Sequence, residues 1–209
     1  DGKELTLFFT KKAVTDKGYF LGFADLEGPD NSFVSYLTND GKEFHFSSPV
    51  SYLNKKTTEV NSSDPETLAQ TLNWAFSEYP SNFKVMDILA HGGGYFGLGT
   101  DDYKPDQSKK QIMSVADFGY ALKKGLKGRQ LDVLNMLSCL MGNAEALYEL
   151  RDVVKVVIAS EDSIAATKDT TAFFTTEFTR IVSQPNIHPF DVGKHMTIFA
   201  NAKNENTGY

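Results

Sequence analysis

Cys139 and His91 are the two residues whose side chains and placement could together perform chemistry. Cys139 is the single cysteine of the chain, so it forms no internal disulfide and is available as a nucleophile. A thiol attacks a carbonyl as its thiolate, and histidine takes the thiol proton near neutral pH. Gly92 directly follows His91, and its N–H and that of Cys139 are candidates for an oxyanion hole. The pair predicts a Cys/His dyad, although either residue alone is more simply a buried cysteine or a turn histidine.

The elements that must position this pair alternate between strand and helix from about residue 61. Apolar runs predict strands over residues 85–90, 133–137 and 153–159. Helical spacing and turn signals predict helices over 65–79, 114–122, from Asn143, over 171–182 and over 189–202, the first with a Ser63–Glu66 capping box. This alternation is typical of a parallel sheet with helices on both faces, whose sites form at the carboxyl ends of the strands. Since His91 and Cys139 each follow a predicted strand, we expect both at one edge of the sheet.

The first sixty residues predict short strands. They cover residues 5–10, 19–24, 33–37 and 43–46, and the last two flank Asp40-Gly41, a hairpin turn signal. We expect one domain over residues 1–209, with a strand-rich part over 1–60 and an α/β core over 61–209.

The composition excludes several classes of protein. With 209 residues, 41% hydrophobic and 23% charged, the chain resembles an ordinary globular protein. A net charge of -6 argues against nucleic acid or an anionic membrane as partner. No apolar run approaches the ~20 residues that span a bilayer. We expect a soluble protein; the non-basic start, residues 1–4, leaves its location open, including the mature form of a secreted protein.

Competing motifs around His91 are weak. Residues 92–97 fit G-x-G-x-x-G, but the polar residues from Asp101 onward follow where a dinucleotide site needs a helix. His91 to Gly94 match the HGGG motif of esterases, yet the chain has no G-x-S-x-G segment. The four histidines are scattered, and Asp101-Asp102 lacks the spacing of a calcium loop. No metal or cofactor is therefore expected, and calcium dependence has no support.

Four blocks of residues resemble the clostripain family of cysteine peptidases, which belongs to the clan of caspases, legumain and gingipains. They are residues 64–68 leading to Trp74, residues 88–94 around His91, Cys139 to Met141 followed by residues 145–150, and residues 159–162. Their order and spacing agree over residues 64–163, and His91 lies 48 residues before Cys139, close to the about 50 of caspases. The resemblance implies a caspase-like α/β/α sandwich with a mostly parallel central sheet, and a dyad that hydrolyses peptide bonds in a peptide or protein substrate.

One position departs from the family pattern. The family usually has an aspartate two residues before the nucleophile, which is thought to bind a basic P1 side chain, and this chain has Leu137. A buried lysine or arginine head needs a paired charge. Preference for basic P1 residues is therefore not predicted, unless Glu161 or Asp162 supplies the charge. Family members usually continue beyond the position of Tyr209, and some are cut between the two blocks, where residues 101–111 contain three lysines.

Three functions remain open. The leading one is a cysteine endopeptidase. The second is a weak or inactive relative that acts as a binding or scaffold module, for which Leu137 is the motive. The third is a cysteine-dependent acyl transferase or amidase on the same dyad. Oligomeric state is not indicated.

Overall fold

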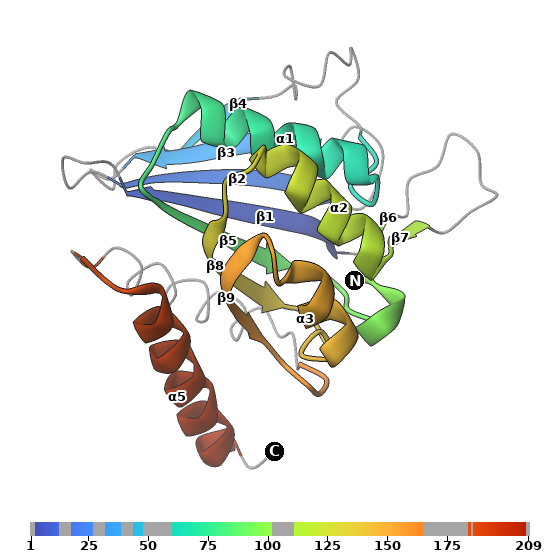
Figure 1. Cartoon of the computed structure of the whole chain (residues 1–209), viewed down its shortest axis with the longest axis vertical. Helices are drawn as coiled ribbons and strands as arrows, with labels where there is room; N and C mark the ends of the chain where they lie inside the picture. The colour runs from blue at the N-terminus through green and yellow to red at the C-terminus, as the bar shows by residue number, and fades with distance from the viewer. Residues whose placement is uncertain are drawn as a thin grey trace.

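A seven-stranded sheet forms the centre of the protein in a computed structural model (Figure 1). The structure describes residues 3–12, 18–26, 32–38, 44–47, 60–101, 111–164, 184 and 186–207. The strand order is β4-β3-β2-β1-β5-β8-β9, with β1 at Lys3–Lys12, β2 at Gly18–Leu26, β3 at Ser32–Thr38, β4 at Phe44–Ser47, β5 at Phe83–Leu89, β8 at Leu131–Leu137 and β9 at Val154–Ala159.

The sheet has a parallel part and an antiparallel extension. Strands β5, β8 and β9 pair in parallel, as the helical crossovers between them require. Strands β1 to β4 pair in antiparallel fashion in sequence order, and β1 joins β5 antiparallel. All four predicted N-terminal strands are confirmed, and β3 and β4 pair in antiparallel fashion, while the predicted turn at Asp40-Gly41 lies outside the described residues. The N-terminal strands therefore enlarge the same sheet that carries the predicted site.

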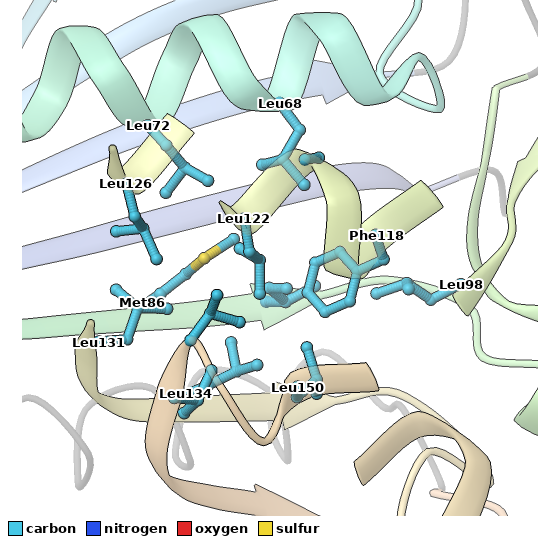
Figure 2. Close-up of a cluster of buried hydrophobic side chains, with 14 of the residues drawn as sticks. Leu68, Leu72, Met86, Leu98, Phe118, Leu122, Leu126, Leu131, Leu134 and Leu150 are labelled. Atoms are coloured by element: carbon cyan, nitrogen blue, oxygen red, sulfur yellow. The ribbon is translucent and has the colours of Figure 1, made fainter. Parts of the chain in front are cut away.

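Helices cover both faces of the parallel part. Helices α1 (Pro65–Glu78), α2 (Val115–Leu126) and α3 (Ala144–Leu150) share one buried cluster with Met86 of β5 and Leu134 of β8 (Figure 2). On the other face, Val192 and Met196 of α5 (Pro189–Thr207) pack on Val85 and Val133. Alternate strand residues thus face opposite helix layers. This arrangement confirms the predicted α/β/α sandwich.

The start of α1 differs from the prediction. Asp64, not Ser63, is the N-cap, and its Oδ1 accepts a hydrogen bond from the N–H of Glu66 at 2.9 Å. The carboxylate of Glu66 is engaged with Gln70 and Lys124, so the Ser63–Glu66 capping box does not form. Pro65 at the first helical position already lacks an N–H, and Asp64 caps the next free donor.

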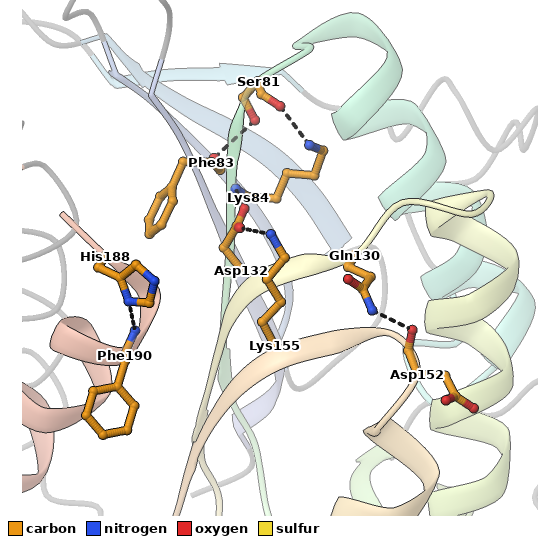
Figure 3. A network of polar contacts seen from close by, with 9 residues as sticks. All are labelled: Ser81, Phe83, Lys84, Gln130, Asp132, Asp152, Lys155, His188 and Phe190. Carbon is orange, nitrogen blue, oxygen red and sulfur yellow. Dashed lines mark hydrogen bonds and ion pairs between the residues drawn. The ribbon is translucent and has the colours of Figure 1, made fainter. Parts of the chain in front are cut away.

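The amino ends of the parallel strands are tied together by Asp132 (Figure 3). Its carboxylate accepts from the backbone N–H of Lys84 at 2.6 Å and from Nζ of Lys155 at 2.7 Å. Asp132 lies on the central strand β8, so it links β5 on one side with β9 on the other. This edge of the sheet is anchored by polar contacts, and the opposite, carboxyl edge carries the loops of the predicted site.

The other elements refine the predictions. The glycine-rich loop contains a 3-10 turn, η2 (Gly94–Phe96), and a small sheet of β6 (Leu98–Asp101) and β7 (Gln111–Met113). Helix α2 begins at its predicted cap, Ser114, but continues past residue 122. The predicted helices at 143 and 189–202 are confirmed, while the one over 171–182 lies outside the described residues. Within the described ranges, none of the helices combines the length and apolar character needed to cross a membrane.

Candidate active site

The pairing of β5 with β8 brings His91 and Cys139 to corresponding positions. Val85 pairs with Val133 and Leu89 with Leu137, so each partner lies 48 residues further along the chain. His91 and Cys139 are also 48 residues apart, and each comes two residues after its strand ends. The spacing noted in the sequence is therefore the register of the two strands. His91 is exposed and Cys139 is half-buried.

Gly92 holds the two loops in direct backbone contact. A Cβ atom built on Gly92 would lie 2.0 Å from the carbonyl oxygen of Cys139 and 2.8 Å from its nitrogen. Such distances leave no space for a side chain, so glycine is required here by close approach. Among the described residues, neither the Gly92 N–H nor the Cys139 N–H donates to a backbone carbonyl in the hydrogen bonds outside helices and strands. Both predicted oxyanion donors thus lie side by side.

The turn after Cys139 has a strained backbone. Leu140 has φ 63°, in the left-handed region that non-glycine residues rarely adopt. Asn143 holds this conformation, because its Nδ2 donates to the Leu140 carbonyl at 2.8 Å. The Oδ1 atom of the same side chain accepts from the N–H of Ala146 and caps α3. Asn143 therefore couples the helix start to the shape of the Cys139 turn.

Residues 160–164, after β9, line the other side of this turn. The N–H of Gly142 donates to the Ser160 carbonyl at 2.8 Å, and the N–H of Leu140 donates to the Asp162 carbonyl at 3.2 Å. The Cys139 Sγ accepts from the N–H of Ile164 at 3.2 Å and lies 3.7 Å from the Ile164 carbonyl oxygen. Among the described residues, no hydrogen bond joins Sγ to the His91 ring. The hydrogen bonds of Sγ are thus with the Ile164 peptide group.

The predicted binding residues fall into two groups around Cys139. Leu137 pairs with Leu89, and both are half-buried at the last paired position of β8 and β5, two residues before Cys139 and His91. Glu161 and Asp162 are exposed on the loop beside the Cys139 turn. The Asp162 Oδ1 accepts from the N–H of Ser163 at 2.6 Å. The two paired leucines are therefore apolar neighbours of Cys139, while Glu161 and Asp162 lie on a separate loop.

A buried polar pair, Asp87 and Asn135, lies two residues before Leu89 and Leu137 on the same two strands. The Asn135 Nδ2 donates to the Asp87 Oδ1 at 2.8 Å, across paired positions of β5 and β8. Asp87 is only 1% exposed, and its Oδ2 has no hydrogen-bond partner within the described part of the chain. Burial raises the pKa of Asp87 to about 7, against the opposing effect of hydrogen bonds from Asn135 and the Ile88 backbone. The Asp87 carboxyl group therefore keeps its proton to a pH well above that at which an ordinary aspartate ionises.

Metal ligands do not gather at this site. In the part of the chain that the structure describes, no group of three or more His, Cys, Asp or Glu side chains is placed to hold a metal ion. His188 precedes α5, where its Nδ1 accepts from the N–H of Phe190, and His195 is exposed on that helix. His188 therefore lies in the loop before α5, and His195 lies on the exposed side of that helix.

Comparison with protein-family models matches residues 37–202 to the clostripain family, Peptidase C11. The match covers most of the chain and includes both His91 and Cys139. The chain belongs to the clostripain family. The resemblance that rested on four sequence blocks is thereby confirmed, and with it membership of a family of cysteine peptidases.

Solved structures similar to this clostripain-family chain are also C11 proteases. A secreted C11 cysteine protease from Bacteroides thetaiotaomicron, in complex with an irreversible peptide inhibitor, is 18% identical with a TM-score of 0.46; the match covers 71% of this chain and 36% of that one. An inactive zymogen C11 protease from Parabacteroides distasonis is 19% identical with a TM-score of 0.42, over 75% of this chain and 38% of that one. The present chain thus spans well under half the length of these proteins. Comparison with curated protein sequences gives no match.

Sequence reasoning missed the residues that act through the backbone. Ile164 contacts the thiol through its peptide group, which no side-chain type could signal. Asn143 was predicted as a helix cap but not as the support of the Leu140 turn. Asp87 lies inside a strand predicted from its apolar residues, and its pairing with Asn135 is visible only through the strand register.

Proposed function

We propose that this chain carries the catalytic centre of a cysteine endopeptidase, with Cys139 as nucleophile and His91 as general base. One observation carries the proposal: the β5–β8 register places both residues two positions beyond paired strand ends, and Gly92 packs on the Cys139 backbone. Membership of the clostripain family supports the same assignment. Nucleophile and base brought together at a strand edge are what acyl transfer requires.

The proposed reaction proceeds in two stages. The Cys139 thiol transfers its proton to His91, and Sγ forms a bond to the scissile carbonyl carbon. The carbon–nitrogen bond then breaks as His91 returns the proton to the leaving amine, which gives a thioester. In the second stage His91 takes a proton from water, hydroxide adds to the thioester carbon, and the Cys139 thiol is released with the proton.

The oxyanion of each tetrahedral intermediate requires N–H donors. The N–H groups of Gly92 and Cys139 are our assignment, supported by their adjacency and by the lack of a backbone carbonyl acceptor for either among the described loop contacts. Losing one such donor commonly slows a reaction by about 10²- to 10³-fold. The missing side chain of Gly92 is what allows its backbone to lie against the Cys139 backbone.

The P1 residue of the substrate is proposed to be uncharged. Leu89 and Leu137 form the apolar step next to the dyad, and a lysine or arginine head placed on them would be desolvated without a paired charge. Paired fluorogenic peptides with leucine or arginine at P1 test this. Equal or faster cleavage after arginine would contradict it and would direct attention to Glu161 and Asp162 as the source of charge.

The catalytic assignment is tested with Cys139→Ala and His91→Ala. Both variants are expected to lose cleavage of an internally quenched peptide library, while Ser138→Ala, beside the nucleophile, keeps it. A peptidyl electrophile is expected to label Cys139 faster in the folded protein than in urea. If Cys139→Ala cleaved like the wild type, the assignment would be wrong.

The second candidate is a binding module without turnover. It is favoured by the hydrogen bond that the Cys139 Sγ accepts from the Ile164 N–H, which engages the thiol with a backbone group. Labelling no faster than in the denatured control would support this candidate. An acyl transferase or amidase on the same dyad is separated by identifying the products, which would include an acylated acceptor or free ammonia.

A further inference from the structure

Four exposed apolar side chains surround Gly93 and Gly94 beside the dyad. They are Tyr95, Phe96, Ile112 and Leu140, and they are called the loop surface below. Tyr95 and Phe96 are each 63% exposed, which is unusual for two adjacent aromatic residues outside an interface.

The loop surface is contiguous. A Cβ atom built on Gly93 would lie 3.6 Å from both the Ile112 Cδ1 and the Phe96 Cβ, and one on Gly94 would lie 3.6 Å from the Leu140 Cβ. The Tyr95 and Phe96 rings are 4.0 Å apart at a tilt of 31°. The members come from three segments that are separate in the sequence, so folding gathers them around the two glycines.

The aromatic pair is held out by a hydrogen-bonded loop. The N–H of Gly93 donates to the Gly97 carbonyl at 2.8 Å, and the N–H of Gly99 donates to the His91 carbonyl at 2.9 Å. Gly97 and Leu98 are buried against the body of the protein. The two rings therefore project from the tip of a hydrogen-bonded hairpin, and this backbone structure keeps them exposed.

The two chain segments that flank the dyad also lack formal charge. Residues 88–100 and 133–144 contain no Asp, Glu, Lys or Arg, in a chain where 23% of residues are charged. A ligand that lies along them therefore meets apolar side chains and backbone groups. Within these two segments, a charged side chain of the ligand would lose hydration without meeting an oppositely charged side chain.

We propose that the loop surface binds apolar and aromatic side chains of the polypeptide substrate next to the scissile bond. The proposal rests on the proposed peptidase function. Its continuity with the dyad is direct, because Leu140 follows Cys139 and the two glycines lie within three residues of His91. A second copy of the chain fits less well, since stable protein interfaces use about 20–30 residues a side and the loop surface has four.

The test compares Tyr95→Ser/Phe96→Ser with a matched control, Tyr148→Ser/Phe190→Ser. The control removes the same two residue types at similar exposure, 63% and 66%, from α3 and α5. Each double variant is made in the active chain and in the Cys139→Ala background. Two internally quenched peptides are used, with phenylalanine or serine at the positions flanking the same scissile bond.

In the active protein, wild type and control are expected to favour the phenylalanine peptide, and the loop variant to lose about tenfold of that preference through KM, the size of effect typical of one interface anchor. The rate of Cys139 labelling by iodoacetamide should not change, because this reagent is too small to reach the loop surface. In the Cys139→Ala background, the affinity for the phenylalanine peptide should fall by the same factor.

The outcomes separate the two proposals. If the wild type, the control and the loop variant all cleaved the peptides with the same preference for phenylalanine, the substrate role of the loop surface would be overturned. The peptidase assignment would stay intact. Preferential binding of the phenylalanine peptide without turnover would overturn the peptidase assignment alone. A peptide that is neither bound nor cleaved would count against both. A change of oligomeric state in the loop variant, measured by light scattering, would assign the surface to self-association and overturn the substrate role.

Discussion

Replacing Asp87 with asparagine should remove a pH-dependent loss of stability. The folded protein keeps the proton of Asp87 up to a pKa of about 7, because the carboxyl group is buried. The unfolded chain releases the proton near the ordinary value of 3.8. Between these values the folded state binds more protons than the unfolded state, so the free energy of unfolding falls as pH rises. The stabilisation of the folded state by protonated Asp87 is fully present below pH 3.8 and is lost above about pH 7.

The magnitude follows from the difference between the two pKa values. One unit corresponds to 1.36 kcal/mol, so a rise from 3.8 to about 7 amounts to about 4 kcal/mol in total. Between pH 4.5 and pH 8 the wild type should lose about 3 kcal/mol from this residue alone. Asparagine has the shape of the protonated acid and keeps an oxygen for the Asn135 Nδ2, but it cannot ionise. The Asp87→Asn variant should therefore be more stable than the wild type at pH 8.

Urea denaturation at several pH values, followed by tryptophan fluorescence, measures this difference. Titrations that the two proteins share cancel in the subtraction, and Asp191→Asn, which removes an exposed carboxylate on α5, controls for the change in net charge. The difference in unfolding free energy between Asp87→Asn and wild type should grow with pH and level off above about pH 7. If the unfolding free energies of the two proteins changed with pH in parallel, the inference that Asp87 is buried and protonated would be refuted.

Three further outcomes follow from the backbone contacts of the site. Gly92→Ala should destabilise the protein by about 1–3 kcal/mol and slow Cys139 labelling, because the new methyl group would overlap the Cys139 carbonyl; unchanged denaturation and labelling would contradict the contact. Asn143→Ala should cost about 1 kcal/mol as a lost cap and also change the labelling rate, since it releases the Leu140 turn. Ser114→Ala removes the N-cap of α2 and should cost a similar amount while leaving labelling as it was, and equal labelling in both cap variants would show that Asn143 acts on the helix alone.

The fold was largely predictable because its signals are local. Apolar runs with valine and aromatic residues gave every strand of the large sheet, and helix caps at Ser114 and Asn143 gave two helix starts. The cap of α1 was misplaced by one residue, since Ser63 and Asp64 are both good capping residues and only the geometry at Pro65 decides between them. The short strands β6 and β7 escaped notice because glycine and polar residues dominate that segment.

The site was predictable in its chemistry but not in its geometry. Residue types and strand ends indicated Cys139 and His91, whereas the register that aligns them depends on which strands pair. The same register places Asn135 opposite Asp87 and Leu89 opposite Leu137. No property of a single strand encodes such a pairing, so the buried acid and the apolar step next to the dyad emerge only from the folded sheet.

The candidate site is held together by its backbone more than by its side chains. Gly92 packs on the Cys139 peptide, and the turn from Cys139 to Gly142 is bonded to residues 160–162 through N–H and carbonyl groups. Neither contact uses the side chain of His91 or Leu137. Leu137 therefore sets what lies beside Cys139 without taking part in the contacts that position it. For the same reason, His91→Ala should unfold at nearly the wild-type urea concentration, so that lost activity in this variant reports chemistry. Cys139→Ala also removes the Sγ contacts with the Ile164 peptide group, so its midpoint is expected to fall. A large shift of the His91→Ala midpoint would show that this side chain itself supports the two loops.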